Sequence, residues 1–250
     1  MTRWSRPGEV RHVLHTVDSF STPLYTVAEA AVYLDVPNST FHSWTRGYTN
    51  NRGDRRVVKG EPVVTAFESR GGRPSVPFIG LAEGLVLAAF RRQGVPLQRI
   101  RPAINALQRE IGVEHALASR ALYTDGAEVL YDFAKQHEND LQGRDARELV
   151  VVRNNQRVFT EVVADYLTRL EFGPENYVVA IRLPAYDRAD VIVDTRRSFG
   201  KPIFAHGGAR VADALELFWA GDELDDVADE FGVPRHELED ALRVASHRAA

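Results

Sequence analysis

Apolar residues near the N-terminus recur at a spacing that predicts two short helices joined by a tight turn. Residues 27–34 carry Val, Ala, Ala and Leu at helical spacing, so one face of a first helix can be buried. Thr26 and Glu29 form a capping-box pattern at the start of this helix. A proline then ends it, because the residue before a proline is pushed out of the α region. A second helix would bury Phe41 and Trp44, which gives a helix-turn-helix.

The outer face of the second helix predicts a contact with DNA. It carries short hydrogen-bonding side chains and one arginine, namely Ser39, Thr40, His42, Ser43 and Arg46. Such side chains suit a helix that approaches base edges and phosphates in the major groove. An ordinary helical hairpin within a core is the alternative interpretation.

The segment after the helix-turn-helix predicts a winged variant of this motif. Residues 48–54 are rich in Gly, Asn and Asp and are expected to form a loop. Short strands are expected over residues 57–67 and 76–79, joined by a glycine turn that Arg70 and Arg73 flank. These arginines could reach phosphates or a minor groove, although a solvated surface loop is the alternative.

A third helix is expected over residues 81–92, and a further apolar series follows it. The series steps by three and four residues through Leu97, Ile100, Ile104, Leu107 and Ile111. Such a seam is typical of a short dimerisation helix, so a homodimer is expected. A stripe buried within one chain is the alternative.

The middle of the chain predicts a small α+β unit with mostly antiparallel strands. Asp125-Gly126 is a two-residue hairpin signal between expected strands at residues 120–124 and 127–133. Further short strands are expected at residues 149–153, 177–183 and 191–193.

The C-terminal part predicts a second helix-turn-helix by shape. A helix from residue 210 is expected to end at Gly221, and two further helices follow on either side of a Gly-Val-Pro turn. The outer face of the last helix is expected to carry Arg235, His236, Glu237, Glu239 and Asp240. Exposed carboxylates oppose the phosphates of DNA, so a protein contact is the better interpretation of this module.

These elements together predict an α+β protein in three parts. Residues 1–111 form a winged helix-turn-helix with a dimerisation-type helix, residues 112–198 a small α+β domain, and residues 199–250 an acidic helical domain.

Charge is distributed unevenly along the chain. The net charge of −4 divides into +6 for residues 1–110, −3 for residues 111–206 and −7 for residues 207–250. A basic N-terminal part and an acidic C-terminal part indicate that the two ends of the chain bind different partners.

Composition excludes several other classes of protein. The chain has no cysteine, which removes disulfides and thiolate metal sites. No apolar run approaches the roughly 18 residues that a membrane span needs. The N-terminus has no hydrophobic signal core, so a cytoplasmic protein is expected.

An enzyme is not expected. The turn at His206 lacks an accompanying Gly-X-Ser-X-Gly nucleophile motif. The eight histidines show no His-Glu-X-X-His arrangement, so neither a metal nor another cofactor is expected.

Two motifs resemble known bacterial regulators. Residues 27–31, Thr40-Phe41-X-X-Trp44 and Arg46-Gly47 are similar to the DNA-binding domain of MerR-type and excisionase-type regulators. Residues 199–204, 220–223 and 227–233 resemble a small helical domain of bacterial antitoxins that accompany PIN-domain ribonuclease toxins. Across nearly the full chain, the pair of motifs resembles a long VapB-type antitoxin.

This resemblance implies a type II toxin–antitoxin system. The protein would neutralise a PIN-domain toxin by direct binding and would repress its own operon as a dimer on operator DNA. The acidic tail would complement a basic surface on an RNA-cleaving partner.

Two other functions remain open at this stage. In an effector-sensing regulator, aromatic residues of the middle segment would line a small-molecule pocket: Tyr123, Tyr131, Phe133, Tyr166 and Tyr177. Core packing is the usual role of such aromatics. In an adaptor, the first helix-turn-helix would be structural and would bind no DNA.

Overall fold

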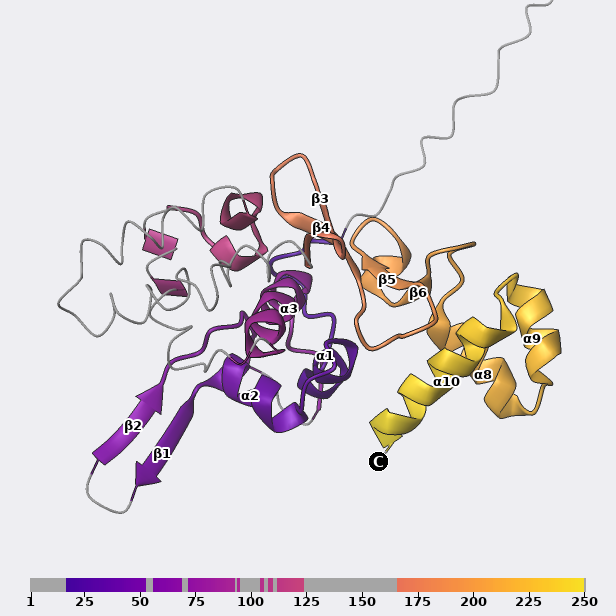
Figure 1. The fold of residues 1–250 in the computed structure, drawn as a ribbon, viewed down its shortest axis with the longest axis horizontal. Coiled ribbons are helices and arrows are strands. Elements are labelled where there is room, and N and C mark those ends of the chain that lie inside the picture. The colour runs from indigo at the N-terminus through magenta and orange to yellow at the C-terminus, as the bar shows by residue number, and fades with distance from the viewer. Residues whose placement is uncertain are drawn as a thin grey trace, which may run out of the picture.

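The computed structural model of the chain describes residues 17–52, 56–68, 72–92, 94, 104–105, 108–109, 112–123 and 166–249. The described part is an α+β fold, which confirms the expected class (Figure 1). Its N-terminal elements are α1 (Val27–Tyr33), α2 (Asn38–Arg46), β1 (Tyr48–Arg52), β2 (Arg56–Gly60), α3 (Phe78–Arg92) and the 3-10 helix η1 (Ala116–Ala118). Its later elements are β3 (Leu170–Phe172), β4 (Val178–Arg182), β5 (Val191–Asp194), η2 (Ser198–Gly200), β6 (Ile203–Phe204), α8 (Val211–Ala220), α9 (Leu224–Phe231) and α10 (Arg235–Ala249).

Helix α3 is the central element of the N-terminal half. Every residue from Phe78 to Phe90 is buried, and all of them except Glu83 are apolar or glycine, as expected for a helix at the centre of a core. Gly84 lets the helix-turn-helix lie directly on α3. A Cβ atom at this position would lie 2.6 Å from the Phe41 ring and 2.8 Å from Cδ1 of Leu34.

The sheet is antiparallel, in the order β3-β4-β5-β6. The expected strands at residues 177–183 and 191–193 form β4 and β5. Strand β6 pairs with β5 and lies beyond residue 198, so the sheet draws on both the expected middle and terminal segments. The hairpin turn at residues 125–126 and the strands expected at 127–133 and 149–153 lie outside the described residues.

The strand expected at residues 120–124 is wrong where the structure describes it. Residues 120–123 are helical. Ser119 makes the only extended pairing described for this segment, as an isolated antiparallel bridge with Tyr177. The backbone N–H of Arg120 then donates a hydrogen bond to the carbonyl of Asn176 at 2.7 Å, and a helix begins at this residue.

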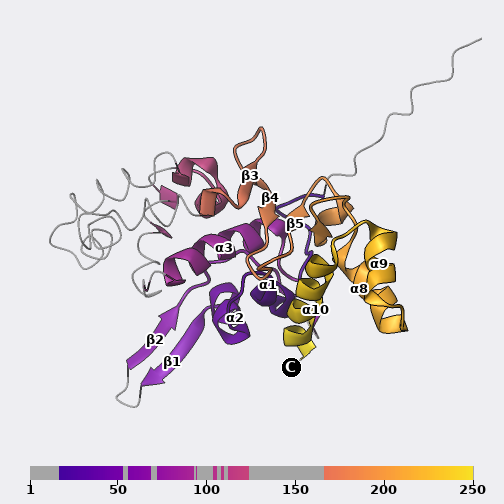
Figure 2. The same cartoon turned by 45° about the vertical axis from the view of Figure 1, so that its right-hand side comes forward.

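Three helices follow the sheet, as the apolar spacing of the C-terminal part predicts. Gly221 ends α8 in the left-handed conformation, which confirms its role as a C-terminal cap. Helix α10 packs against both α8 and α9, and it also packs against α1 in the N-terminal half (Figure 2).

The interpretation of the outer face of α10 needs a correction. Glu237 and Asp240 are buried, whereas Arg235, His236 and Glu239 are exposed. Oδ2 of Asp240 accepts the backbone N–H groups of Arg188 and Ala189 at 2.8 and 3.0 Å. The loop before β5 thus supplies the hydrogen-bond donors that let this carboxylate be buried. Helical spacing alone does not reveal these donors.

Hydrogen bonds join the N-terminal half to the C-terminal half. The buried hydroxyl of Tyr25 donates to the carbonyl of Gly200 at 2.6 Å, and Nζ of Lys201 donates to the carbonyl of Leu24 at 2.8 Å. One core cluster runs from Leu24 to Val244. Within the residues that the structure describes, no helix is long and apolar enough to cross a membrane.

Candidate nucleic-acid interface

Helix α1 begins and ends as the sequence predicts. Oγ1 of Thr26 accepts the N–H of Glu29 at 3.1 Å, and the Glu29 carboxylate accepts the N–H of Thr26 at 2.9 Å. This reciprocal pair confirms the capping box. After Asp35 in the left-handed region, α2 starts behind Pro37, whose carbonyl accepts the N–H of Phe41 at 3.1 Å.

Helix α2 is fixed to the core by its inner face. Phe41 and Trp44 are fully buried and pack edge to face, with ring centroids 5.9 Å apart. This confirms the predicted inner positions. Thr45 is also buried, and its hydroxyl donates to the carbonyl of His42 at 3.0 Å.

The predicted DNA-contacting residues of α2 reach solvent. Ser39, His42 and Arg46 are exposed, and Thr40 and Ser43 are partly exposed. The Ser43 hydroxyl donates to the carbonyl of Thr40 at 2.7 Å, but its oxygen can still accept a hydrogen bond. All five residues thus lie on a helix whose other face is anchored by Phe41 and Trp44.

A β-hairpin follows α2 directly, and the sequence interpretation predicted only part of it, because the strand expected at residues 57–67 overlaps β2 at residues 57–60. Strands β1 and β2 pair antiparallel from Tyr48 opposite Gly60 to Arg52 opposite Arg56. Residues 48–52 are therefore strand and not loop. The expected strand at residues 76–79 is also wrong, because Val76 makes only an isolated bridge and Phe78 begins α3.

Glycine explains how the chain enters this hairpin. Gly47 has a φ of +73°, and a Cβ atom there would lie 2.3 Å from the carbonyl oxygen of Gly60. Only glycine fits this close backbone approach without a shift. Pairing with β2 then holds residues 50 and 51, both Asn, in a conformation that their intrinsic preference does not favour.

The hairpin projects from the body of the protein beside α2 (Figures 1 and 2). Its strands carry Arg52, Arg56 and Lys59, basic residues that the sequence interpretation did not select. The run of basic residues at 52–59 was the available signal. The backbone N–H of Phe67 donates to the carbonyl of Ser75, and Arg73 is exposed shortly before Ser75. Arg70 lies outside the described residues.

A buried carboxylate on α3 supports the base of this interface. The carbonyl of Trp44 accepts the N–H groups of Val63 and Val64 at 2.8 and 3.1 Å, which ties the end of α2 to the chain returning from the hairpin. The next residue, Thr65, donates its N–H to Oε2 of Glu83 at 2.6 Å. Glu83 thus connects the helix-turn-helix to the central helix.

His115 completes this polar cluster. Its Nδ1 lies 2.9 Å from Oε1 of Glu83 and 3.2 Å from Oγ1 of Thr65. The hydrogen bond to Glu83 raises the pKa of His115, and partial burial only partly opposes this effect.

The stability of the protein should therefore fall as pH rises through the pKa of folded His115. A histidine whose pKa is higher in the folded state stabilises fully below its unfolded pKa of about 6.5, and this contribution is lost above the folded pKa. Urea unfolding at about pH 6 and about pH 9 measures the change. The His115→Gln variant should lose less stability over this interval, and an equal loss in both proteins would contradict the assignment.

The structure also places three of the aromatic residues proposed for a central ligand pocket. Tyr123 packs edge to face on Phe172, and the hydroxyl of Tyr166 accepts a hydrogen bond from Arg92 at 2.6 Å. Tyr177 packs edge to face on Phe20. Each of these three residues thus has a different partner within the protein. Tyr131 and Phe133 lie outside the described residues.

Of the expected dimerisation seam, the structure describes Ile104, which is buried within the chain. Leu97, Ile100, Leu107 and Ile111 lie outside the described residues.

Comparison with known proteins agrees with this geometry. A family model described as "Putative DNA-binding HTH domain" matches residues 23–104, which include α1, α2, the hairpin and α3. The "Putative antitoxin VapB45" of Mycobacterium tuberculosis is 45% identical over 225 residues, which cover 89% of this chain and 94% of that protein. The uncharacterized protein Rv2308 of the same organism is 25% identical over 230 residues, 88% of each chain.

The fold is also similar to a solved structure. The X-ray crystal structure of Rv2018 from Mycobacterium tuberculosis matches with a TM-score of 0.72 and 43% sequence identity, covering 89% of this chain and 98% of that one. With a relative at this identity aligned over nearly its whole length, and with a helix-turn-helix at the N-terminus, the chain belongs to the VapB family of antitoxins.

Proposed function

We propose that this antitoxin binds operator DNA through α2 and the β1–β2 hairpin, neutralises a PIN-domain ribonuclease toxin by direct binding, and represses its own operon as a homodimer. The observation that carries the DNA-binding part is the exposed polar face of α2 beside a projecting basic hairpin. The antitoxin part rests on the family to which the chain belongs.

In this proposal α2 enters the major groove. Ser39, Thr40, His42, Ser43 and Arg46 face base edges and phosphates, in the manner of a recognition helix. The hairpin acts as the wing, and its basic residues approach the backbone or the minor groove. Arg70 and Arg73 remain candidates for further phosphate contacts.

Replacing Arg46 with alanine should weaken operator binding by about 1–3 kcal/mol if its guanidinium reads a base edge. Fluorescence anisotropy with operator DNA and with a scrambled fragment measures the loss. A loss on both fragments would make Arg46 a phosphate contact. Unchanged affinity for both would remove Arg46 from the interface. His236→Ala, at an exposed position of α10 outside the proposed interface, serves as the control.

The toxin-binding part of the proposal uses the acidic surface of α9. Asp225, Asp226, Asp229 and Glu230 are all exposed, while Val227 and Ala228 on the same helix are buried. Asp225 is paired with Arg235 at 2.6 Å, so the other three carboxylates dominate the surface charge. An enzyme that cleaves RNA presents a basic surface, which these carboxylates would complement.

Reversing two of these charges should weaken toxin binding. The double substitution Asp229→Lys and Glu230→Lys places cations near the C-terminus of α9, where the helix dipole favours them, so the helix should remain folded. We expect at least about a tenfold loss of affinity for the toxin encoded by the adjacent gene, measured by calorimetry. Unchanged affinity would move the toxin site elsewhere. Glu175→Lys, in the exposed turn between β3 and β4, is the matched control.

Co-expression with the adjacent gene tests the antitoxin role itself. Growth rescue together with a complex on size exclusion would support it, and a harmless neighbour that forms no complex would contradict it. Size exclusion with light scattering on the chain alone tests the proposed homodimer.

A further inference from the structure

A cavity lies between the helix-turn-helix and the C-terminal helices, apart from the proposed DNA and toxin surfaces. It is lined by α1, by the segment around β6, and by α8 and α10, and it encloses about 560 Å³. This volume is within the range of small-molecule sites, which are concave and mostly apolar with a few polar groups.

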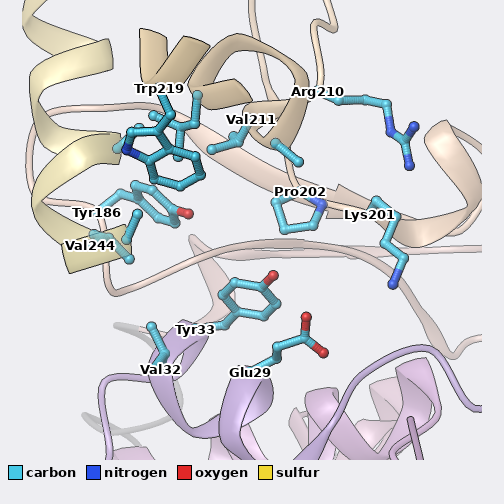
Figure 3. A pocket seen from close by; sticks show the side chains of 14 residues that line it. Glu29, Val32, Tyr33, Tyr186, Lys201, Pro202, Arg210, Val211, Trp219 and Val244 are labelled. Carbon is cyan, nitrogen blue, oxygen red and sulfur yellow. The ribbon is translucent and has the colours of Figure 1, made fainter. Parts of the chain in front are cut away.

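One end of the cavity is aromatic and apolar. Figure 3 shows Trp219 and Tyr186 facing each other near Val244. Trp219 is 64% exposed, the largest exposed fraction among the large hydrophobic side chains that the structure describes. An exposed indole on the wall of a cavity offers a flat apolar surface to a ligand.

The other end of the cavity is polar and carries a surplus of positive charge. Lys201, Arg210 and Glu29 lie there, and the hydroxyl of Tyr33 points into the space between the two ends (Figure 3). The Glu29 carboxylate is held by the backbone N–H and the hydroxyl of Thr26 at 2.9 and 3.0 Å. Arg210 is paired with Asp213 only at 3.7 Å, beyond hydrogen-bond distance, so its guanidinium can turn toward a ligand.

We propose that this cavity binds a small amphipathic carboxylate, whose apolar body lies against Trp219 and Tyr186 and whose acid group faces Lys201 and Arg210. The distribution of polarity favours this class, because the end with Lys201 and Arg210 carries one more positive charge than the Glu29 carboxylate balances. A cation would be repelled there. The proposal does not depend on DNA or toxin binding.

Calorimetry on the full chain tests this site with decanoate and 3-phenylpropanoate, each compared with its primary amide. We expect at least one acid to bind about fivefold or more tightly than its amide and to raise the melting temperature. Arg210→Gln should remove the preference for the acid over the amide. Equal binding of acid and amide, or no binding of either acid, would overturn the proposal.

A steric variant distinguishes this cavity from any other binding surface. Ala212 is exposed on α8 and lines the cavity, so Ala212→Trp should fill the space and abolish binding of the acids. Ala220→Trp, at an exposed position of the same helix outside the cavity lining, is the matched control and should bind as the wild type does. Binding that survives Ala212→Trp in a folded protein would contradict the assignment.

Discussion

Replacing Glu83 with alanine is expected to lower the free energy of unfolding by about 2–4 kcal/mol, because two partly buried groups would lose a buried carboxylate as their acceptor. The carboxylate is 4% exposed and accepts from the N–H of Thr65, while its other oxygen lies 2.9 Å from the ring nitrogen of His115. Thr65 and His115, which are both partly buried, would lose this partner. Because total stabilities are about 5–15 kcal/mol, urea unfolding should show the change clearly.

The effect should also appear in DNA binding. Thr65 follows the two residues that donate to the carbonyl of Trp44, so a loosened segment no longer fixes the end of α2. Glu83→Gln retains an acceptor for Thr65 and should cost less than half as much as Glu83→Ala. It should also abolish the pH dependence assigned to His115. Equal losses in both variants would show that the charge of Glu83 stabilises nothing.

Replacing Asp240 with alanine is expected to cost about 2–4 kcal/mol, because a buried N–H (Ala189), a partly buried N–H (Arg188) and the Arg243 guanidinium would lose this acceptor. Burial raises the pKa of Asp240, but the N–H groups of Ala189 and Arg188 and the guanidinium of Arg243 together lower it below its usual value. Thermal unfolding followed by circular dichroism measures the loss.

Acid titration provides the control for Asp240. A carboxyl group whose folded pKa is depressed stabilises above its unfolded pKa of about 3.9, and this contribution disappears as pH falls through the folded pKa. The wild type should therefore approach the stability of Asp240→Ala in strong acid. A difference that stays constant with pH would mean that the ionised form of Asp240 is not what stabilises the loop.

Local patterns were sufficient to predict the helix-turn-helix. The capping box of Thr26 and Glu29 is a contact across three residues, and burial of Phe41 and Trp44 follows from helical spacing. Gly221 likewise ends α8 through its own backbone conformation. In each case the signal lies within one or two turns of the chain, so the sequence reveals it.

The elements that sequence analysis missed depend on contacts between distant residues. The hairpin after α2 was predicted only in part: Val57 and Val58 favour the second strand, but the polar residues of β1 show no alternating pattern. The pairing of β1 with β2 and the close approach of Gly47 to Gly60 define the first strand. Strand β6 has two residues and exists because β5 offers an edge.

Buried charges were the least predictable part of the structure. Asp240 has polar spacing on a helix, yet donors from a loop about fifty residues earlier draw it inward. Glu83 interrupts an apolar run, and its partners Thr65 and His115 are apparent only when three segments meet.

Salt-dependent operator binding tests the central claim most directly. Fluorescence anisotropy of a labelled fragment from upstream of this operon should show sequence-selective binding, with affinity falling by at least about tenfold between 50 and 200 mM salt. A protein that contacts several phosphates through α2 and the hairpin must behave in this way. Absence of binding at the lowest salt, or equal affinity for a scrambled fragment, would contradict the assignment of this face as an operator-reading surface.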